Sequence, residues 1–120
     1  MKLEDVRTFA LSLPESTEEP HFDMSSFRIR GKIFATVPPD HEHLHIFVGE
    51  RETRGIIAED PVAFEELWWG KELRGVRVNL ASAVDELVFE LLEESWRRRA
   101  PKRVVAQFDA DQDRPQNRSA

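Results

Sequence analysis

The spacing of apolar residues predicts a helix near the start of the chain. Apolar residues recur every three or four positions and form one stripe, made of Leu3, Val6, Ala10 and Leu13. Such a stripe is typical of an amphipathic helix. Pro14 ends the predicted helix, because the residue before a proline avoids the helical backbone conformation. Residues 15–20 are polar and acidic, and we expect a loop there.

The spacing then changes to the alternation that is typical of strands. Phe27 and Ile29 alternate with two arginines, and an apolar run covers residues 33–37. A glycine lies between these two segments. The pattern therefore predicts a β-hairpin with its turn at residues 30–32.

The register of this hairpin stays open at the level of sequence. A two-residue turn aligns Phe34 with Phe27 and Ile29, whereas a three-residue loop aligns Ile33 and Ala35 with them. Because strand side chains alternate between the two faces, the two alternatives bury different residues.

The pattern of the middle of the chain indicates three more strands, one helix and one more turn region. The pattern predicts a strand at 43–48, a short helix at 50–60 that is interrupted or ends near Gly55, an aromatic strand at 64–69, a polar turn at 70–75 and a strand at 76–80. The last of these is clearly amphipathic, since its valines alternate with Arg77 and Asn79.

The strongest helical pattern follows, from about residue 82 to residue 99. Its apolar stripe consists of Val84, Leu87, Val88, Leu91, Leu92 and Trp96. After Pro101, a short helical stretch is expected through Phe108. Residues 109–120 contain almost no apolar side chain, and we expect this tail to be disordered.

This order of elements predicts an α+β fold of the type α-β(3)-α-β(2)-α. Short connections between neighbouring strands indicate a five-stranded antiparallel sheet. Three helices are too few to cover both faces of the sheet, so we expect two layers and one open sheet face. The length of 120 residues fits one compact domain, which we place at residues 1–108.

Composition and charge narrow the classes of function. The net charge of −6 excludes a uniformly basic nucleic-acid binder but leaves room for a local basic patch. The absence of cysteine excludes disulfides, cysteine-based zinc sites and thiol catalysis. The first residues show no secretory signal and the apolar runs are far too short for a membrane span, so we expect a cytoplasmic protein that does not bind membranes.

Several segments resemble the MmcQ/YjbR family. They are LSLPESTEEP, FRIRGKIFATV, WWGKELRGVRVNL and LVFELLEESWRRRAPKR, and the resemblance covers residues 1 to about 104. The resemblance implies a small α-β(3)-α-β(2)-α fold similar to type III secretion chaperones. It also implies DNA binding, with the hairpins acting as two wings. It implies no catalytic residue and no cofactor.

Six cations are candidates for nucleic-acid contacts. They lie on or near the two predicted hairpins, at Arg28, Arg30, Lys32, Lys71, Arg74 and Arg77. If both hairpins share the open face, these cations would contact phosphates, while Phe47 and the tryptophan pair would stack on bases. The simpler interpretation is that these side chains solvate an exposed sheet face.

Two tryptophans, Trp68 and Trp69, are candidates for protein contacts. Neighbouring strand residues point to opposite faces, so one of them is expected in the core and the other at the surface. An exposed tryptophan is typical of a binding hot spot. We therefore keep a protein-interaction or chaperone-like module, with a protein partner or a second copy of this chain, as the alternative function.

Two other clusters have a functional and a simpler interpretation. The run Arg97, Arg98, Arg99, Lys102 and Arg103 is able to bind phosphates or an acidic partner, or else to complement the helix dipole and pair with nearby glutamates. His41, His43 and His45 would share one strand face, so that three imidazoles could meet at a metal, but surface histidines explain them as well. We predict no metal site.

Sequence motifs of common enzymes are absent. There is no G-x-x-x-x-G-K-[ST], G-x-G-x-x-G, G-x-S-x-G or H-E-x-x-H motif. No catalytic residue is therefore assigned, and the expected function is a nucleic-acid-binding module that uses basic hairpins on an open sheet face.

Overall fold

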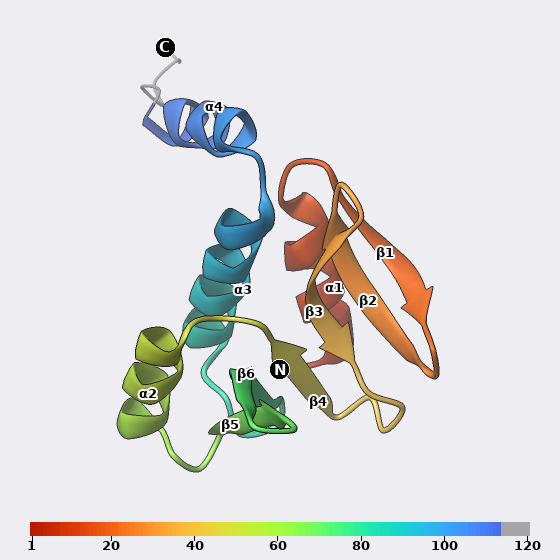
Figure 1. Ribbon diagram of the computed structural model, residues 1–120, viewed down its shortest axis with the longest axis vertical. Helices are drawn as coiled ribbons and strands as arrows, with labels where there is room; N and C mark the ends of the chain where they lie inside the picture. Colours follow the sequence, from red (N-terminus) through yellow and green to blue (C-terminus); the bar gives the residue numbers. More distant parts are fainter. Residues whose placement is uncertain (114–120) are drawn as a thin grey trace.

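The computed structural model describes residues 1–113 and has an α+β fold. Four helices and six strands follow one another in this order: α1 (Leu3–Ser12), β1 (Ser16–His21), β2 (Met24–Ile29), β3 (Lys32–Val37), β4 (His43–Ile46), α2 (Glu50–Glu59), β5 (Phe64–Trp69), β6 (Glu72–Asn79), α3 (Asp85–Arg99) and α4 (Lys102–Asp113). Figure 1 shows this arrangement.

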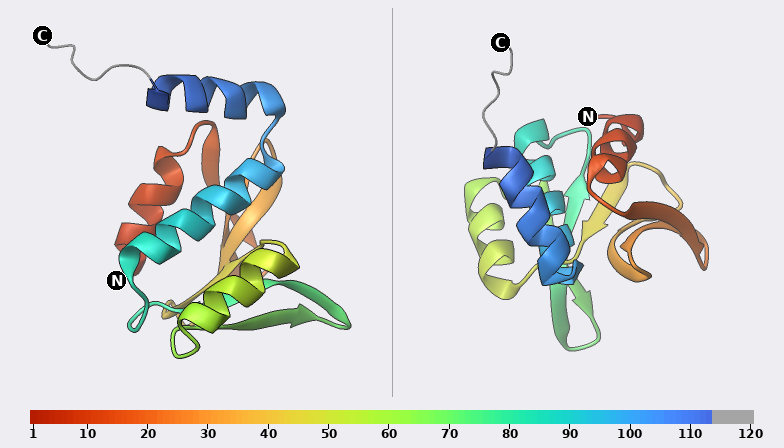
Figure 2. Two further views of the ribbon diagram at one scale, coloured as in Figure 1. Left: turned by 90° about the vertical axis from the view of Figure 1, so that its left-hand side faces the viewer. Right: turned by 90° about the horizontal axis from the view of Figure 1, so that it is seen from above.

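The strands form one antiparallel sheet in the order β1-β2-β3-β4-β6-β5. The connection through α2 brings β6 beside β4 and leaves β5 at the edge. Helices α1 and α3 lie side by side on one face, and α2 packs against β5 and β6 (Figures 1 and 2). The expected two-layer α+β fold with an antiparallel sheet and an open face is therefore confirmed.

The number of strands is six, because residues 16–21 form a strand rather than the expected loop. Strand β1 pairs with β2 along its whole length. Arg7 of α1 holds it from the covered side, with its Nε donating to Glu18 Oε1 over 2.7 Å. The strand contains few apolar residues, since as an edge strand it buries none of its residues fully.

The hairpin of β2 and β3 combines both of the registers considered above. Its turn has two residues, Arg30 and Gly31, which both have positive φ angles, as this kind of turn requires. A bulge then shifts the pairing so that Phe27 faces Ala35. Phe34 is the extra residue, and it too is fully buried.

Other differences concern the ends of elements. Helix α2 continues through Gly55 without interruption, and β6 begins at Glu72, so that only residues 70 and 71 form the second hairpin turn. Helix α3 begins at Asp85, which leaves Val84 half exposed before it. Helix α4 extends to Asp113, beyond the expected end at residue 108; residues 114–120 of the expected tail lie outside the described residues.

The core lies between the sheet and helices α1 and α3. Its largest fully buried side chain is Trp96, whose indole N–H donates to the carbonyl of Pro14 over 3.1 Å. Helix α4 extends this contact, because Phe108 packs edge-on against Trp96 with ring centroids 5.1 Å apart. No helix within residues 1–113 is long and apolar enough to cross a membrane.

Candidate nucleic-acid interface

A row of polar residues crosses the open face of the sheet. Strand register places them side by side on five neighbouring strands: Ser26, Thr36, His45, Arg77 and Glu65. One position along each strand, the neighbouring row of side chains points to the covered face and is largely apolar. Alternation along each strand therefore separates the core from a polar face.

His45 is the centre of this row. Arg77 Nη1 lies 3.2 Å from His45 Nε2, and Thr36 Oγ1 lies 3.4 Å from His45 Nδ1. A guanidinium only donates, so Nε2 accepts and the ring proton is on Nδ1, which faces the threonine hydroxyl. Burial lowers the pKa of His45, and the positive charge of Arg77 lowers it further. The ring is therefore neutral near pH 7.

Asp40 fixes the loop that leads into this strand. Its Oδ1 accepts hydrogen bonds from the backbone N–H groups of Glu42 and His43, and its Oδ2 lies 2.8 Å from His43 Nδ1. These contacts, led by the Glu42 N–H, lower the pKa of Asp40 to about 2. Asp40 also lies 3.7 Å from Arg77, which is thus held between a carboxylate and His45.

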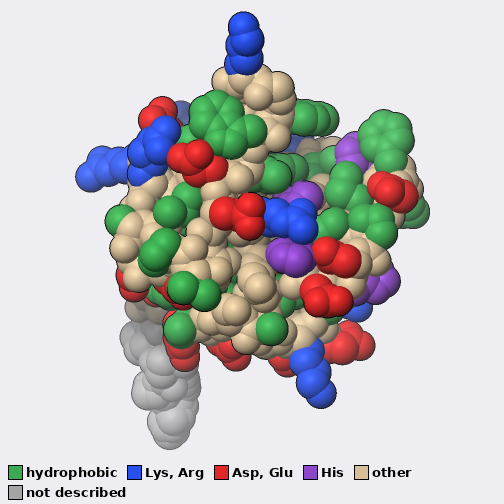
Figure 3. All heavy atoms as spheres, turned by 90° about the horizontal axis from the view of Figure 1, so that it is seen from below, with side chains coloured by type: hydrophobic (Ala, Val, Ile, Leu, Met, Phe, Trp, Pro, Cys, Tyr) green, Lys and Arg blue, Asp and Glu red, His purple; other side chains and the backbone are tan. Residues whose placement is uncertain are grey.

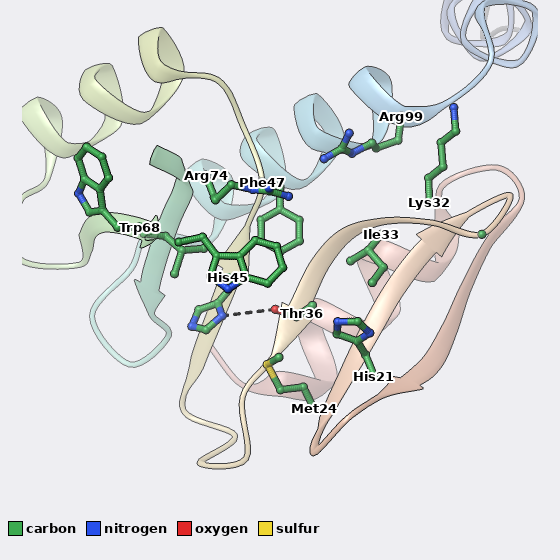
Figure 4. A pocket seen from close by; sticks show the side chains of 13 residues that line it. His21, Met24, Lys32, Ile33, Thr36, His45, Phe47, Trp68, Arg74 and Arg99 are labelled. Carbon is green, nitrogen blue, oxygen red and sulfur yellow. Dashed lines mark hydrogen bonds between the residues drawn. The ribbon is translucent and has the colours of Figure 1, made fainter. Parts of the chain in front are cut away.

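A cavity of about 610 Å³ opens on this face between the two hairpins. Figure 4 shows the side chains that surround it. The cavity is lined by His21, Met24, Gly31, Lys32, Ile33, Thr36, His45, Phe47, Leu67, Trp68, Trp69, Arg74 and Arg99. No Asp or Glu is among them, so every formally charged lining residue is a cation.

Arg74 covers the aromatic side of the cavity. Its guanidinium carbon lies 4.8 Å from the ring centroid of Trp69 and 5.7 Å from that of Phe47. Arg74 Nη1 also donates to Glu72 Oε1 over 3.0 Å, but Glu72 is exposed and does not line the cavity. Cation–π contacts of this kind hold the guanidinium plane in place.

Phe47 is fixed by its own backbone. Its N–H donates to the carbonyl of Phe34, and its carbonyl accepts from Ser95 Oγ over 2.7 Å and from Arg98 Nη1 over 3.1 Å. Ser95 Oγ also lies 2.6 Å from the Phe34 carbonyl. Helix α3 therefore anchors the backbone of Phe47 directly after β4, beside Phe34, the bulge residue of β3.

Arg99 is a cavity residue that the hairpin-based prediction missed. It lies at the end of α3, and its Nε is buried without a hydrogen-bond partner. Within residues 1–113 it makes no ion pair. The sequence did contain a signal, since Arg99 is part of the basic run at residues 97–103. Its neighbour Arg97 does pair, with Glu93 and Asp109.

The structure separates the six predicted cations into different environments. Lys32 and Arg74 line the cavity, and Arg77 is held by His45 and Asp40. Arg28 donates to Ser26 Oγ and to the Pro20 carbonyl. The remaining two also lie outside the cavity lining: Arg30 forms a bidentate ion pair with Glu15, and Lys71 lies in the exposed turn of the β5–β6 hairpin.

Neither tryptophan of the pair is in the core, contrary to the sequence expectation. Trp68 is 48% exposed and Trp69 is 68% exposed. A bulge at Leu67/Trp68 breaks the alternation, and the hairpin tip lies beyond the helices. The Trp68 indole N–H donates to Glu66, and its ring turns away from the other lining side chains (Figure 4).

The three clustered histidines do not form a common site. His41 lies in a turn with positive φ, His43 pairs with Asp40, and only His45 lines the cavity. Within residues 1–113 no group of three His, Asp or Glu side chains is placed to hold a metal ion.

The face seen in Figure 3 is not divided into a basic and an acidic side. Asp and Glu side chains lie among the Lys and Arg side chains on it. The positive charge on this face therefore does not form one continuous basic patch.

Comparison with known proteins identifies relatives in sequence and in fold. A family model described as YjbR matches residues 11–98. The crystal structure of the Deinococcus radiodurans protein DR2400, with the family-model domain DUF419, superposes with a TM-score of 0.69. That comparison covers 79% of this chain and 75% of that chain at 21% sequence identity, which establishes a similar fold. No curated protein matches this sequence.

Proposed function

The chain belongs to the YjbR family, and we propose that it is a nucleic-acid-binding module whose binding site is the cavity between its two hairpins. One observation carries this proposal: the cavity combines cations and aromatic rings and contains no carboxylate. Cations attract phosphates, and aromatic rings stack on bases of any sequence. The hairpins thus take part, but through residues that face inward.

The shape of the site favours a single strand over a duplex. Rings at the mouth of a cavity reach only bases that are free of a stacked partner, as they are in single strands. The cation positions agree with this, because Lys32, Arg74 and Arg99 line one concave space. A duplex would instead need cations arranged along a ridge or a flat face.

Fluorescence anisotropy with a labelled oligothymidine and with a duplex of equal length tests this function. We expect weak binding at low salt, stronger for the single strand. Three phosphate contacts give a slope of about −2 for log affinity against log salt. Raising the salt threefold is then expected to reduce the affinity about tenfold.

A pair of double variants separates the cavity from general charge. Lys32→Glu with Arg74→Glu is expected to weaken binding at least about tenfold. Arg51→Glu with Arg103→Glu changes the net charge equally at exposed positions outside the cavity lining, and is expected to have a much smaller effect. No binding at low salt, or an equal loss in both variants, would contradict the proposal.

A second candidate function is protein interaction, which the exposed aromatic side chains favour. Besides the two tryptophans, Phe22 at the turn between β1 and β2 is 91% exposed. Exposed rings of this size are typical of interface anchors. Sedimentation velocity tests self-association: a concentration-dependent dimer that is lost in Trp69→Ser supports this function, and a monomer at all concentrations argues against a second copy as the partner.

A further inference from the structure

We propose that the α3 end of the cavity is a phosphate subsite formed by Arg99 and Arg74, with Lys32 elsewhere in the same cavity lining. The ligand class is a nucleotide, whose phosphate lies between the two arginines and whose base lies against the neighbouring rings. The inference rests on the proposed function, because it assigns chemistry to part of the same cavity. It adds one specific phosphate-binding position, centred on Arg99, which a single nucleotide occupies as well as a longer strand does.

Arg99 carries the first part of the argument. Its Nε is buried and has no acceptor, and within residues 1–113 its guanidinium has no counter-ion. The Arg99 side chain as a whole is half-buried, but a buried N–H donor without an acceptor is costly in free energy, and such groups are rare in native structures. An oxyanion in the cavity would supply both the acceptor and the charge.

The neighbours of Arg99 carry the second part. Burial lowers the pKa of Arg99, and the charges of Arg98 and Arg74 lower it further. Figure 4 shows that the guanidinium groups of Arg74 and Arg99 lie at the same end of the cavity, near Phe47, whereas the ammonium group of Lys32 points away from them. Like charges held together in this way are relieved by an anion that binds between them.

The number and type of the donors favour phosphate over a carboxylate. A phosphate monoester has up to two negative charges and three terminal oxygens, enough to face the guanidinium groups of Arg74 and Arg99 together. Guanidinium groups match such oxygens in pairs. Phe47 and Trp69, which lie beside Arg74, then favour a planar base attached to that phosphate.

Isothermal titration calorimetry with adenosine monophosphate at low salt tests the subsite. We expect binding that inorganic phosphate competes for and that adenosine alone does not reproduce. Arg99→Gln is expected to raise the dissociation constant at least about tenfold, and Arg99→Lys, which keeps the charge but loses the paired donors, by less. Arg103→Gln, an equal loss of charge at an exposed position of α4, is expected to change it less than about twofold.

Thermal melting checks that a loss of binding is not a loss of fold. Without phosphate, Arg99→Gln is expected to melt at the same temperature as the wild type or above it, because the substitution removes an unpaired charge. Added phosphate is expected to raise the melting temperature of the wild type and not that of Arg99→Gln. Unchanged nucleotide binding in Arg99→Gln, or equal binding of adenosine, would overturn the subsite.

The same variants separate this inference from the proposed function. If oligothymidine binds Arg99→Gln as tightly as the wild type, the subsite is wrong and the proposed function stands. If adenosine monophosphate binds through Arg99 but oligothymidine does not bind, the subsite stands, its ligand is a free nucleotide, and the proposed function is wrong. If neither ligand binds the wild type, both are overturned.

Discussion

The two hairpins that flank the cavity differ in how the rest of the protein holds them. The β2–β3 hairpin lies within the sheet, with β1 and β4 on either side, and its apolar residues Phe27, Ile29 and Phe34 are fully buried. The β5–β6 hairpin has β5 as the free edge of the sheet, and its end carries two exposed tryptophans. Both hairpins line the cavity, but the first is held between two strands and the second ends in a free edge.

Their cations differ for the same reason. In the first hairpin, the side chains of Arg28 and Arg30 make hydrogen bonds or ion pairs with the neighbouring strand and loop. In the second, Arg74 lies over aromatic rings and faces the cavity. Lys32 of the first hairpin also lines the cavity, and Arg77 of the second is held by His45 and Asp40, so the neighbours of each cation decide whether it is available for a ligand.

The largest expected effect is on stability, and it concerns the close contact between β6 of the second hairpin and the backbone of β4. A Cβ atom on Gly75 of β6 would lie 2.0 Å from the carbonyl oxygen of Ile46, and the residue has a φ of 152°. Gly75→Ala is therefore expected to cost roughly 3 kcal/mol or more in the free energy of unfolding. Urea denaturation measures this cost.

Two other glycines give matched controls for that measurement. A Cβ on Gly31 of the first hairpin meets no atom within 4 Å, but its φ of 80° is left-handed, so Gly31→Ala is expected to cost about 1–2 kcal/mol. Gly55→Ala, in the open on α2, is expected to stabilise by about 0.5–1 kcal/mol. Equal losses of unfolding free energy in Gly75→Ala and Gly31→Ala would contradict the idea that the rest of the protein holds the two hairpins differently.

A smaller effect concerns His45, which lies on β4 between the two hairpins. Its pKa is lowered in the folded state, so the unfolded chain takes up the proton first as the pH falls. The stability that the neutral ring contributes is complete above the unfolded pKa of about 6.5 and is lost below it, toward the folded pKa. Wild type is therefore expected to lose more stability between pH 7 and pH 5 than His45→Gln.

Urea midpoints of both proteins across this pH range measure the difference. His43 and Arg77 are present in both proteins, and Asp40 stays ionised because its pKa is about 2. A constant difference between the two proteins over the whole range would mean that His45 is not desolvated between the hairpins.

The smallest expected effect is at the tip of the first hairpin. Arg30 and Glu15 form an exposed ion pair, and the pKa of Glu15 is lowered chiefly by its hydrogen bond to Arg30. Exposed pairs contribute little to stability. Arg30→Gln is therefore expected to leave both the urea midpoint and nucleic-acid affinity unchanged, and anisotropy measures the latter. A marked loss of affinity would instead support a direct contact between this hairpin tip and the nucleic acid.

Much of the fold follows from the sequence because its apolar residues keep a regular period. The stripe of α3 and the alternation in β6 were sufficient to place these elements. Strand β1 was missed because its stability comes from pairing with β2 and from the Arg7–Glu18 contact, neither of which leaves an apolar pattern. The bulge at Phe34 was missed because it depends on a carbonyl that Ser95 contacts from α3, far along the chain.

The site was less predictable than the fold. Lys32, Arg74 and Phe47, which the sequence singled out, line the cavity, since each belongs to an alternating strand or its end. The availability of a cation depends on partners that are distant in sequence, such as Glu15 for Arg30. Arg99 was assigned to a general basic run, because nothing in the sequence places the end of α3 beside the hairpins.

The cationic cavity in an acidic protein has a consequence for the timing of ligand binding. The net charge of −6 repels an approaching polyanion within about one Debye length of the surface, about 8 Å, whereas the cavity attracts it only once it is closer still. Salt therefore weakens the repulsion on approach as well as the attraction on contact. For the proposed nucleic-acid complex we therefore expect a lifetime that shortens as salt rises and a rate of encounter that does not fall with it, in contrast to a protein with a broad basic surface.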